Sequence, residues 1–319
     1  MFLSILVLAV SIGVLSRSSE SVIESTVKIS RFFNINQLAV GFLLVAVATS
    51  LPELSVSVES AITGNGALSA GNVFGSNIAN VLVILGAGAF IYGIKISPRE
   101  LGDLGLVVLL TTVISVYIVF SSSVQLRALG FVEGVLLLAL FGIYAWDVLR
   151  KKKPRDRPGV AVSKKEALSA FLHFGAGILL VIISSAFVVD SAVEIALSFS
   201  LAQSFVGATV IALGTSLPEL SIALQALRKK HYGLVLGNAI GSNMTNLTLV
   251  LGSAALINPI NVQLPVFIAA LLFAVVANSL LFYVAAVSKK IDRAGGAFFL
   301  GIYLLYLAVI FGLQVTELI

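Results

Sequence analysis

Residues 49–55 read Thr-Ser-Leu-Pro-Glu-Leu-Ser, and the same seven residues recur at 215–221. The two copies are 166 positions apart, and at that offset residues 41–86 align with residues 207–252 without a gap. The alignment contains 18 identities over 46 positions, most of them clustered in short polar motifs. The chain is therefore predicted to consist of two related halves.

The composition places these motifs in a membrane. The chain has 319 residues, of which 59% are hydrophobic and 11% charged, whereas an average soluble domain has about 25% charged residues. The mean hydropathy is +1.09, which disfavours a soluble globule. Ten apolar stretches approach or exceed the length that spans a bilayer, at 2–31, 36–62, 68–93, 101–121, 128–149, 166–198, 202–227, 234–258, 264–286 and 293–313. They lack the alternation of barrel strands, so we predict an all-α polytopic membrane protein with ten transmembrane helices.

The basic residues predict the orientation of these helices. Of the 20 Lys and Arg residues, 18 lie in or beside the odd-numbered connections, which we therefore expect on the cytoplasmic side. Both termini of this multi-pass protein of the cell membrane should then face outside. A secretory signal peptide is a weaker interpretation of residues 1–16, because no basic residue precedes the apolar run.

The same count predicts the domain organisation. A basic cytoplasmic linker at 150–165 separates a first half at 1–149 from a second half at 166–319. With five helices in each half, the second half must enter the bilayer upside down relative to the first. Inverted repeats are typical of secondary transporters, whose binding sites form at the midplane where discontinuous helices meet. We expect helices 2, 3, 7 and 8 to be discontinuous.

The first motif puts a carboxylate beside a broken helix. Proline has no amide hydrogen, so Pro52 leaves the carbonyl of Ala48 without its helical partner, and Pro218 does the same to Gly214. Glu53 lies one turn after Thr49 on the same predicted face, and the matching positions in the second copy are Glu219 and Thr215.

The second motif adds neutral oxygens. Gly-Asn, Gly-Ser-Asn and a further Asn follow one another at 71–80 and at 237–246. In each copy a serine and an asparagine are four residues apart, and therefore on one face of a helix: Ser76 with Asn80, and Ser242 with Asn246. Carboxylate, amide and hydroxyl oxygens suit hard cations such as Ca²⁺ and Na⁺.

The two glutamates need counter-charge inside a membrane, where a bare carboxylate costs at least about 2.5 kcal/mol. One Ca²⁺, two Na⁺ or two protons would each neutralise the pair. A carrier that is unfavourable when empty, and that different ions neutralise in turn, is physically an exchanger.

These residues carry a resemblance. The paired T-S-L-P-E and G-N-x-x-G-S-N-x-x-N blocks resemble the two α-repeats of the calcium/cation antiporter superfamily, specifically of the sodium/calcium exchanger family. The resemblance covers essentially the whole chain, with α-repeats at 41–86 and 207–252. It implies a transporter rather than an enzyme, without a cofactor, which exchanges Ca²⁺ for Na⁺ by alternating access as the first and sixth helices slide across the rest.

The resemblance also implies a set of ligands. Around Ca²⁺ it places Glu53, Glu219, Thr49 and Thr215. Around Na⁺ it places the carbonyls of Ala46 and Ala212 and the hydroxyls of Ser50, Ser76, Ser216 and Ser242, with Asn80 and Asn246 completing the centre. An aspartate is common in the family at the position of Asn246, and asparagine cannot take up a proton. The Na⁺ stoichiometry therefore stays open. The alternative function is a Ca²⁺/H⁺ exchanger that uses the same site.

Other functions receive less support. An intramembrane protease dyad would use two aspartates rather than glutamates that follow prolines, and a channel would lack saturable coupled flux. The basic charge is nearly all loop charge, so no nucleic-acid partner is expected, and the oligomeric state is left open. Glu59 is either a polar residue at the outer surface or a charge that attracts cations there. We expect Glu20, Glu24, Asp190 and Glu194 to form ion pairs or to lie at solvated helix ends.

Overall fold

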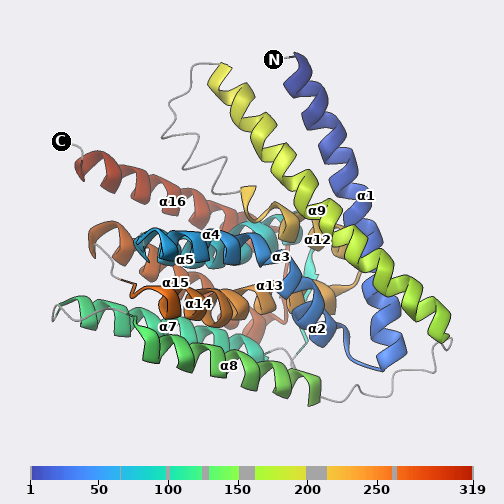
Figure 1. Ribbon diagram of the computed structural model, residues 1–319, viewed down its shortest axis with the longest axis horizontal. Helices are drawn as coiled ribbons and strands as arrows, with labels where there is room; N and C mark the ends of the chain where they lie inside the picture. Colours follow the sequence, from blue (N-terminus) through green and yellow to red (C-terminus); the bar gives the residue numbers. More distant parts are fainter. Residues whose placement is uncertain are drawn as a thin grey trace. The chain divides into compact units, whose positions relative to one another are not determined.

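The computed structural model describes residues 2–64, 66–97, 101–123, 129–150, 162–198, 214–260 and 264–317. Nearly all of these residues are helical (Figure 1). The α-helices are α1 Phe2–Phe33, α2 Gln37–Val40, α3 Val47–Thr49, α4 Leu51–Ile62, α5 Gly66–Ala79, α6 Gly86–Tyr92, α7 Leu101–Ser123, α8 Phe131–Arg150, α9 Lys164–Ser198, α12 Leu217–Arg228, α13 Tyr232–Thr245, α14 Leu251–Ile257, α15 Leu264–Ser288 and α16 Arg293–Glu317. Three π-helical stretches are η1 Gly41–Ala46, η2 Asn80–Leu85 and η5 Asn246–Val250. Two short strands, β1 Ile94–Lys95 and β2 Lys290–Ile291, pair in antiparallel fashion.

Eight of the described helices are long and apolar enough to cross a membrane, and a ninth span results if the bent pair Gln37–Thr49 and Leu51–Ile62 is counted as one. This confirms an all-helical polytopic membrane fold. The predicted span at 202–227 lies partly outside the described residues, and α12 covers its second half. The count of ten helices therefore stays a prediction.

Two spans are far more buried than the others. In Leu68–Tyr92 and Tyr232–Ile257, 72% and 78% of the residues in the apolar window are buried, against 17% to 39% in the other unbroken spans of the described chain. These two spans contain the two Gly-Asn and Gly-Ser-Asn motifs. The polar side chains of the motifs are therefore surrounded by protein, where a membrane protein can tolerate them.

The predicted break in the second helix is confirmed. The chain bends by 47° between Gln37–Thr49 and Leu51–Ile62, and Ser50 lies between the two segments. Pro52 occupies the first turn of α4, where its missing amide hydrogen costs nothing. In the second copy a turn at Thr215 and Ser216 precedes α12, which carries Pro218 in its first turn.

The predicted breaks in the third and eighth helices are wrong. The segments α5, η2 and α6 follow one another directly as one span, and so do α13, η5 and α14. Neither span contains a proline, so no amide hydrogen is missing. Each span instead contains a π-helical stretch, a local distortion that often occurs at functional sites.

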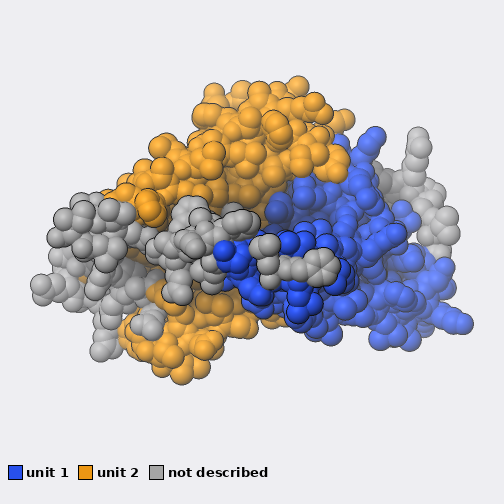
Figure 2. All heavy atoms as spheres, turned by 90° about the horizontal axis from the view of Figure 1, so that it is seen from above, with its two compact units in different colours: residues 1–49, 148–238 blue, residues 50–147, 239–319 orange. Residues whose placement is uncertain are grey.

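The chain forms two compact units, residues 1–49 with 148–238 (unit 1) and residues 50–147 with 239–319 (unit 2) (Figure 2). Each unit combines segments from both predicted halves. Compact units reflect contacts rather than duplication, so the repeat boundaries stay a prediction.

In unit 1, α1 and α9 lie side by side and run in opposite directions (Figure 1). The rings of Phe33 and Phe171 meet edge to face at 5.9 Å. Further along the pair, a β-carbon at Gly177 would come within 2.8 Å of the Val22 side chain, so glycine permits the close approach. Helix α12 also packs on α1, where the Ser19 hydroxyl donates to the Ser221 hydroxyl over 2.8 Å.

In unit 2, α5 is the element on which several others pack. It contacts α4, α14 and α15, and the rings of Phe74 and Phe267 meet edge to face at 5.6 Å. Helix α16 packs on α6, and α15 packs on α7. The side-chain amide of Asn258, at the end of α14, donates to the Ala61 carbonyl of α4 over 3.2 Å. Helix α4 is thus held on two sides.

Candidate cation site

Glu53 is buried in the first turn of α4, with 1% of its surface exposed. The first turn of a helix has amide hydrogens without helical partners and a partial positive charge, which stabilises a carboxylate. The Ser76 hydroxyl of α5 also forms a hydrogen bond with Glu53. The Oε2 atom has no hydrogen-bond partner among the described residues. A buried carboxylate oxygen in this state is available to a cation.

Asn72, for which the sequence predicted no role, fixes the helix that carries Glu53. Its side-chain amide donates to the Glu53 carbonyl over 3.1 Å and to the Ser57 hydroxyl over 3.0 Å. Both bonds join α5 to α4. Asn72 therefore ties the backbone of the glutamate to a neighbouring helix.

Glu219 has the same local setting in unit 1. It lies in the first turn of α12 directly after Pro218, and 2% of its surface is exposed. The sequence predicted that the two glutamates follow kinking prolines. It did not predict that each would lie in the first turn of the helix after the break, which adds the favourable charge of a helix N-terminus to both carboxylates.

The other predicted ligands in the described chain are mostly buried. Thr49, Ser50, Ser76, Ser216, Ser242 and Ala46 are buried, and Thr215 is partly buried. The Thr49 hydroxyl donates to the Ala46 carbonyl over 3.3 Å. The hydroxyls of Ser50, Ser216 and Ser242 have no hydrogen-bond partner among the described residues. Ala212 lies outside the residues that the structure describes.

Asn80 and Asn246 begin the π-helical stretches η2 and η5 at matching positions of the repeat, and both are buried. The Asn80 side-chain amide donates to Oδ1 of Asn243 over 3.0 Å, and the Asn246 amide donates to Oδ1 of Asn77 over 3.3 Å. Within the described chain, Oδ1 of Asn80 and Oδ1 of Asn246 have no hydrogen-bond partner. Each side chain thus uses its nitrogen within unit 2 and leaves its oxygen available.

Three asparagines that sequence reasoning gave no role belong to this arrangement: Asn77, Asn243 and Asn278. Asn77 and Asn243 were visible as motif residues, but their spacing places them off the face shared by serine and the last asparagine. Asn278 lies in the apolar helix α15, where a buried polar residue was itself a signal.

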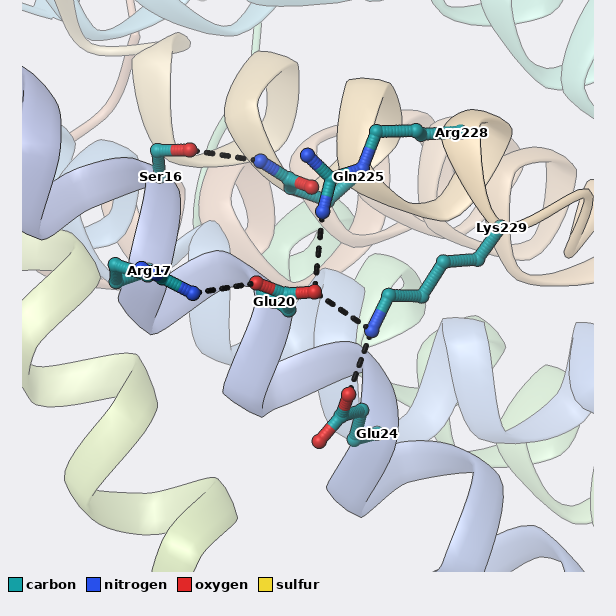
Figure 3. A network of polar contacts seen from close by, with 7 residues as sticks. All are labelled: Ser16, Arg17, Glu20, Glu24, Gln225, Arg228 and Lys229. Carbon is teal, nitrogen blue, oxygen red and sulfur yellow. Dashed lines mark hydrogen bonds and ion pairs between the residues drawn. The ribbon is translucent and has the colours of Figure 1, made fainter.

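The remaining acidic residues are outside this set. Glu20 contacts Arg17, Arg228 and Lys229, and Glu24 contacts Lys229 (Figure 3). The expectation of ion pairs is confirmed for these two.

Glu59, Asp190 and Glu194 are exposed, and the two interpretations of Glu59 both stay predictions. The described residues contain no cluster of three or more His, Asp or Glu side chains that could hold a metal ion. Any site built on Glu53 or Glu219 would therefore combine few carboxylates with neutral oxygens, a donor set that suits Ca²⁺ or Na⁺ rather than a transition metal.

Comparisons with known proteins identify the family of the chain. The family model described as "Sodium/calcium exchanger protein" matches residues 3–149 and 169–312. The sodium/calcium exchanger MaX1 of Methanosarcina acetivorans is 28% identical over 343 residues, covering 96% of this chain and 98% of MaX1. The membrane protein MJ0091 of Methanocaldococcus jannaschii is 33% identical over 291 residues, covering 88% of this chain and 89% of that protein.

A solved structure of the sodium-calcium exchanger NCX_Mj, soaked with Na⁺ and Ca²⁺, superposes with a TM-score of 0.82. It is 26% identical in sequence, and the match covers 97% of this chain and 98% of NCX_Mj.

The fold and its buried oxygens define a multi-pass helical membrane protein of the ion-exchanger class. The chain belongs to the sodium/calcium exchanger protein family, whose members are transporters rather than enzymes.

Proposed function

We propose that this protein is a secondary active antiporter that exchanges Ca²⁺ for Na⁺ across the cell membrane. Glu53 and Glu219 both ligate Ca²⁺ in this proposal, and no cofactor takes part. The observation that carries the proposal is the burial of the two glutamates, each in the first turn of a helix and directly after a proline. Family membership and the names of MaX1 and NCX_Mj support the choice of ions.

The ligand set proposed for the ions extends beyond the carboxylates. Around Ca²⁺ we place Thr49 and Thr215, and around Na⁺ the carbonyls of Ala46 and Ala212 with four hydroxyls. Those hydroxyls are Ser50, Ser76, Ser216 and Ser242, and Asn80 and Asn246 complete the centre. The unpaired oxygens of Ser50, Ser242, Asn80 and Asn246 support this set, because a buried oxygen without a partner is costly unless something binds it.

Exchange follows from the charge of the empty site. Two carboxylates in a membrane protein repel each other and resist dehydration, so a site without cations is unfavourable. One Ca²⁺ or two Na⁺ neutralise the charge equally, and either would let the loaded protein change conformation. The empty protein would not, which couples the two fluxes.

The topology is proposed with the function. We place ten helices in two inverted five-helix repeats, 1–149 and 166–319, joined by the basic linker at 150–165. Both termini face outside, because the basic connections are retained in the cytoplasm. The two stretches that match the family model are separated by residues 150–168, which agrees with a linker in that region.

A Ca²⁺/H⁺ exchanger that uses the same two glutamates is the alternative. Uptake of ⁴⁵Ca²⁺ into proteoliposomes separates the two, with an outward Na⁺ gradient compared with an outward proton gradient at a clamped membrane potential. The proposal predicts uptake driven by Na⁺. Uptake driven by protons alone would keep the glutamates as ligands and reject Na⁺ as the coupled ion.

A further inference from the structure

Buried asparagine side chains of unit 2 form two short chains of hydrogen bonds, which we call relays. Each relay begins at a backbone carbonyl. In the first, the Asn278 amide donates to the Ala274 carbonyl over 2.9 Å. The Asn243 amide donates to Oδ1 of Asn278 over 3.1 Å, and the Asn80 amide donates to Oδ1 of Asn243 over 3.0 Å. The relay therefore ends at Asn80.

The second relay runs in the same manner to Asn246. The Asn77 amide donates to the backbone carbonyl of Asn243 over 3.5 Å. Oδ1 of Asn77 accepts from the Asn246 amide over 3.3 Å. All five asparagines of the two relays are buried, with at most 2% of their surface exposed.

A relay that begins at a backbone carbonyl can have its hydrogen bonds in one direction only. A backbone carbonyl can accept a hydrogen bond but cannot donate one, so the group facing it must be the NH₂ end of the amide. Asn278 then turns its oxygen to Asn243, Asn243 turns its oxygen to Asn80, and Asn80 has only its own oxygen left to present. The same logic leaves Oδ1 of Asn246 at the end of the second relay.

We propose that Asn278 and Asn243 position Asn80, and that Asn77 positions Asn246, so that each presents its carbonyl oxygen rather than its amide nitrogen to the transported cation. The inference rests on the proposed function, in which Asn80 and Asn246 are cation ligands. Among the five asparagines of the relays, the side-chain oxygens without a hydrogen-bond partner in the described chain are those of Asn80 and Asn246, the two residues at the relay ends. An amide turned the other way would point two N–H donors at a cation.

The decisive variant is Asn278→Leu, which removes the first side chain of the relay without opening a large cavity. Loss of outer partners of metal ligands typically weakens binding 10- to 100-fold. We therefore expect the apparent Ca²⁺ affinity, measured by Ca²⁺-dependent thermal stabilisation in detergent, to fall at least about tenfold. Asn278→Ser is a second variant, since its hydroxyl can still bond its own helix but is too short to reach Asn243.

Thr111→Val is the matched control. Thr111 is a fully buried residue of α7 whose hydroxyl donates to the Val107 carbonyl over 2.7 Å. The substitution therefore removes one buried polar group of unit 2 that lies outside the relays. We expect this variant to bind Ca²⁺ like the wild type.

The Asn278→Leu substitution made in the Asn80→Asp protein separates a positioning role of Asn278 from a general loss of structure. In Asn80→Asp the side chain has two equivalent oxygens and no amide hydrogen to donate to Oδ1 of Asn243, so the relay no longer sets its orientation. We expect Asn278→Leu to leave the Ca²⁺ affinity of the Asn80→Asp protein unchanged. The inference would be overturned if Asn278→Leu lowered the Ca²⁺ affinity equally in the wild type and in Asn80→Asp. It would also be overturned if Asn278→Leu and Thr111→Val had equal Ca²⁺ affinities. In either case Ca²⁺ binding by the wild type would leave the proposed function standing. A wild type that Ca²⁺ does not stabilise would reject both.

Discussion

The side-chain amide of Asn80 donates to Oδ1 of Asn243 over 3.0 Å, and the two residues come from different copies of the repeated motif. At the offset of 166, Asn243 is the counterpart of Asn77, which accepts from Asn246 over 3.3 Å. Each copy thus supplies the partner for the last asparagine of the other copy. The two copies of the motif are therefore hydrogen-bonded to each other at two equivalent positions.

Gly237 and Gly71 occupy matching positions of the motif but differ in their surroundings. A β-carbon at Gly237 would lie 2.9 Å from the Leu38 Cα atom, whereas nothing lies within 4 Å of the corresponding point at Gly71. Overpacking of a close contact costs about 1–3 kcal/mol. We expect Gly237→Ala to lower the unfolding temperature in detergent and Gly71→Ala to leave it nearly unchanged. Equal effects would contradict the close approach between α2 and α13.

Lys229 joins α12 to α1 through two carboxylates. Its ammonium lies 3.0 Å from Glu20 and 2.6 Å from Glu24, whereas the one carboxylate that Arg228 contacts among the described residues is Glu20 (Figure 3). We expect Lys229→Met to lower the unfolding temperature more than Arg228→Met.

Salt provides the control for this ion-pair prediction. At 1 M salt the Debye length falls to about 3 Å, which screens exposed pairs. The difference between the two variants should shrink at that concentration. A difference that persists undiminished would show that packing of the lysine stem, rather than charge, holds α12 on α1.

His231 predicts a pH dependence of stability. The Gln37 amide lies 3.3 Å from Nδ1 of His231, and burial, followed by Arg31 and Lys229, lowers the pKa of His231 below its usual value. A lowered pKa favours the neutral form in the folded protein, so the contribution to stability is present above about pH 6.5 and is lost as the pH falls through the folded pKa.

Thermal unfolding between pH 7.5 and 5 measures this contribution. The wild type should lose more stability on acidification than His231→Gln. Identical slopes for the wild type and His231→Gln would contradict the role of the neutral imidazole.

Much of the fold could be predicted because apolar runs and prolines act locally. The nine spans found in the described chain start and end within a few residues of those predicted, and the break before Pro52 follows from its missing amide. The π-helical stretches could not be predicted, since a single extra residue in a turn leaves no mark on an apolar sequence. The breaks expected in the third and eighth helices had no proline to cause them.

The candidate site was predictable only where residues repeat. Glu53, Glu219, Asn80 and Asn246 stand out because both copies carry a polar residue inside an apolar run. Asn278 has no place in the repeated motif, and its role depends on a hydrogen bond between α13 and α15 that spacing along one helix cannot reveal. The two compact units also cut across the predicted halves, because packing depends on contacts between distant segments.

The most direct test of the account is Na⁺-gradient-driven ⁴⁵Ca²⁺ uptake by Glu53→Gln and Glu219→Gln in proteoliposomes. The exposed Glu194 supplies the matched control Glu194→Gln. Because loss of even outer partners weakens metal sites 10- to 100-fold, we expect each buried-glutamate variant to lose uptake by at least about 100-fold while it still folds. Glu194→Gln should transport like the wild type. Retained uptake in a folded Glu53→Gln or Glu219→Gln protein would contradict the central claim that these carboxylates bind the transported Ca²⁺.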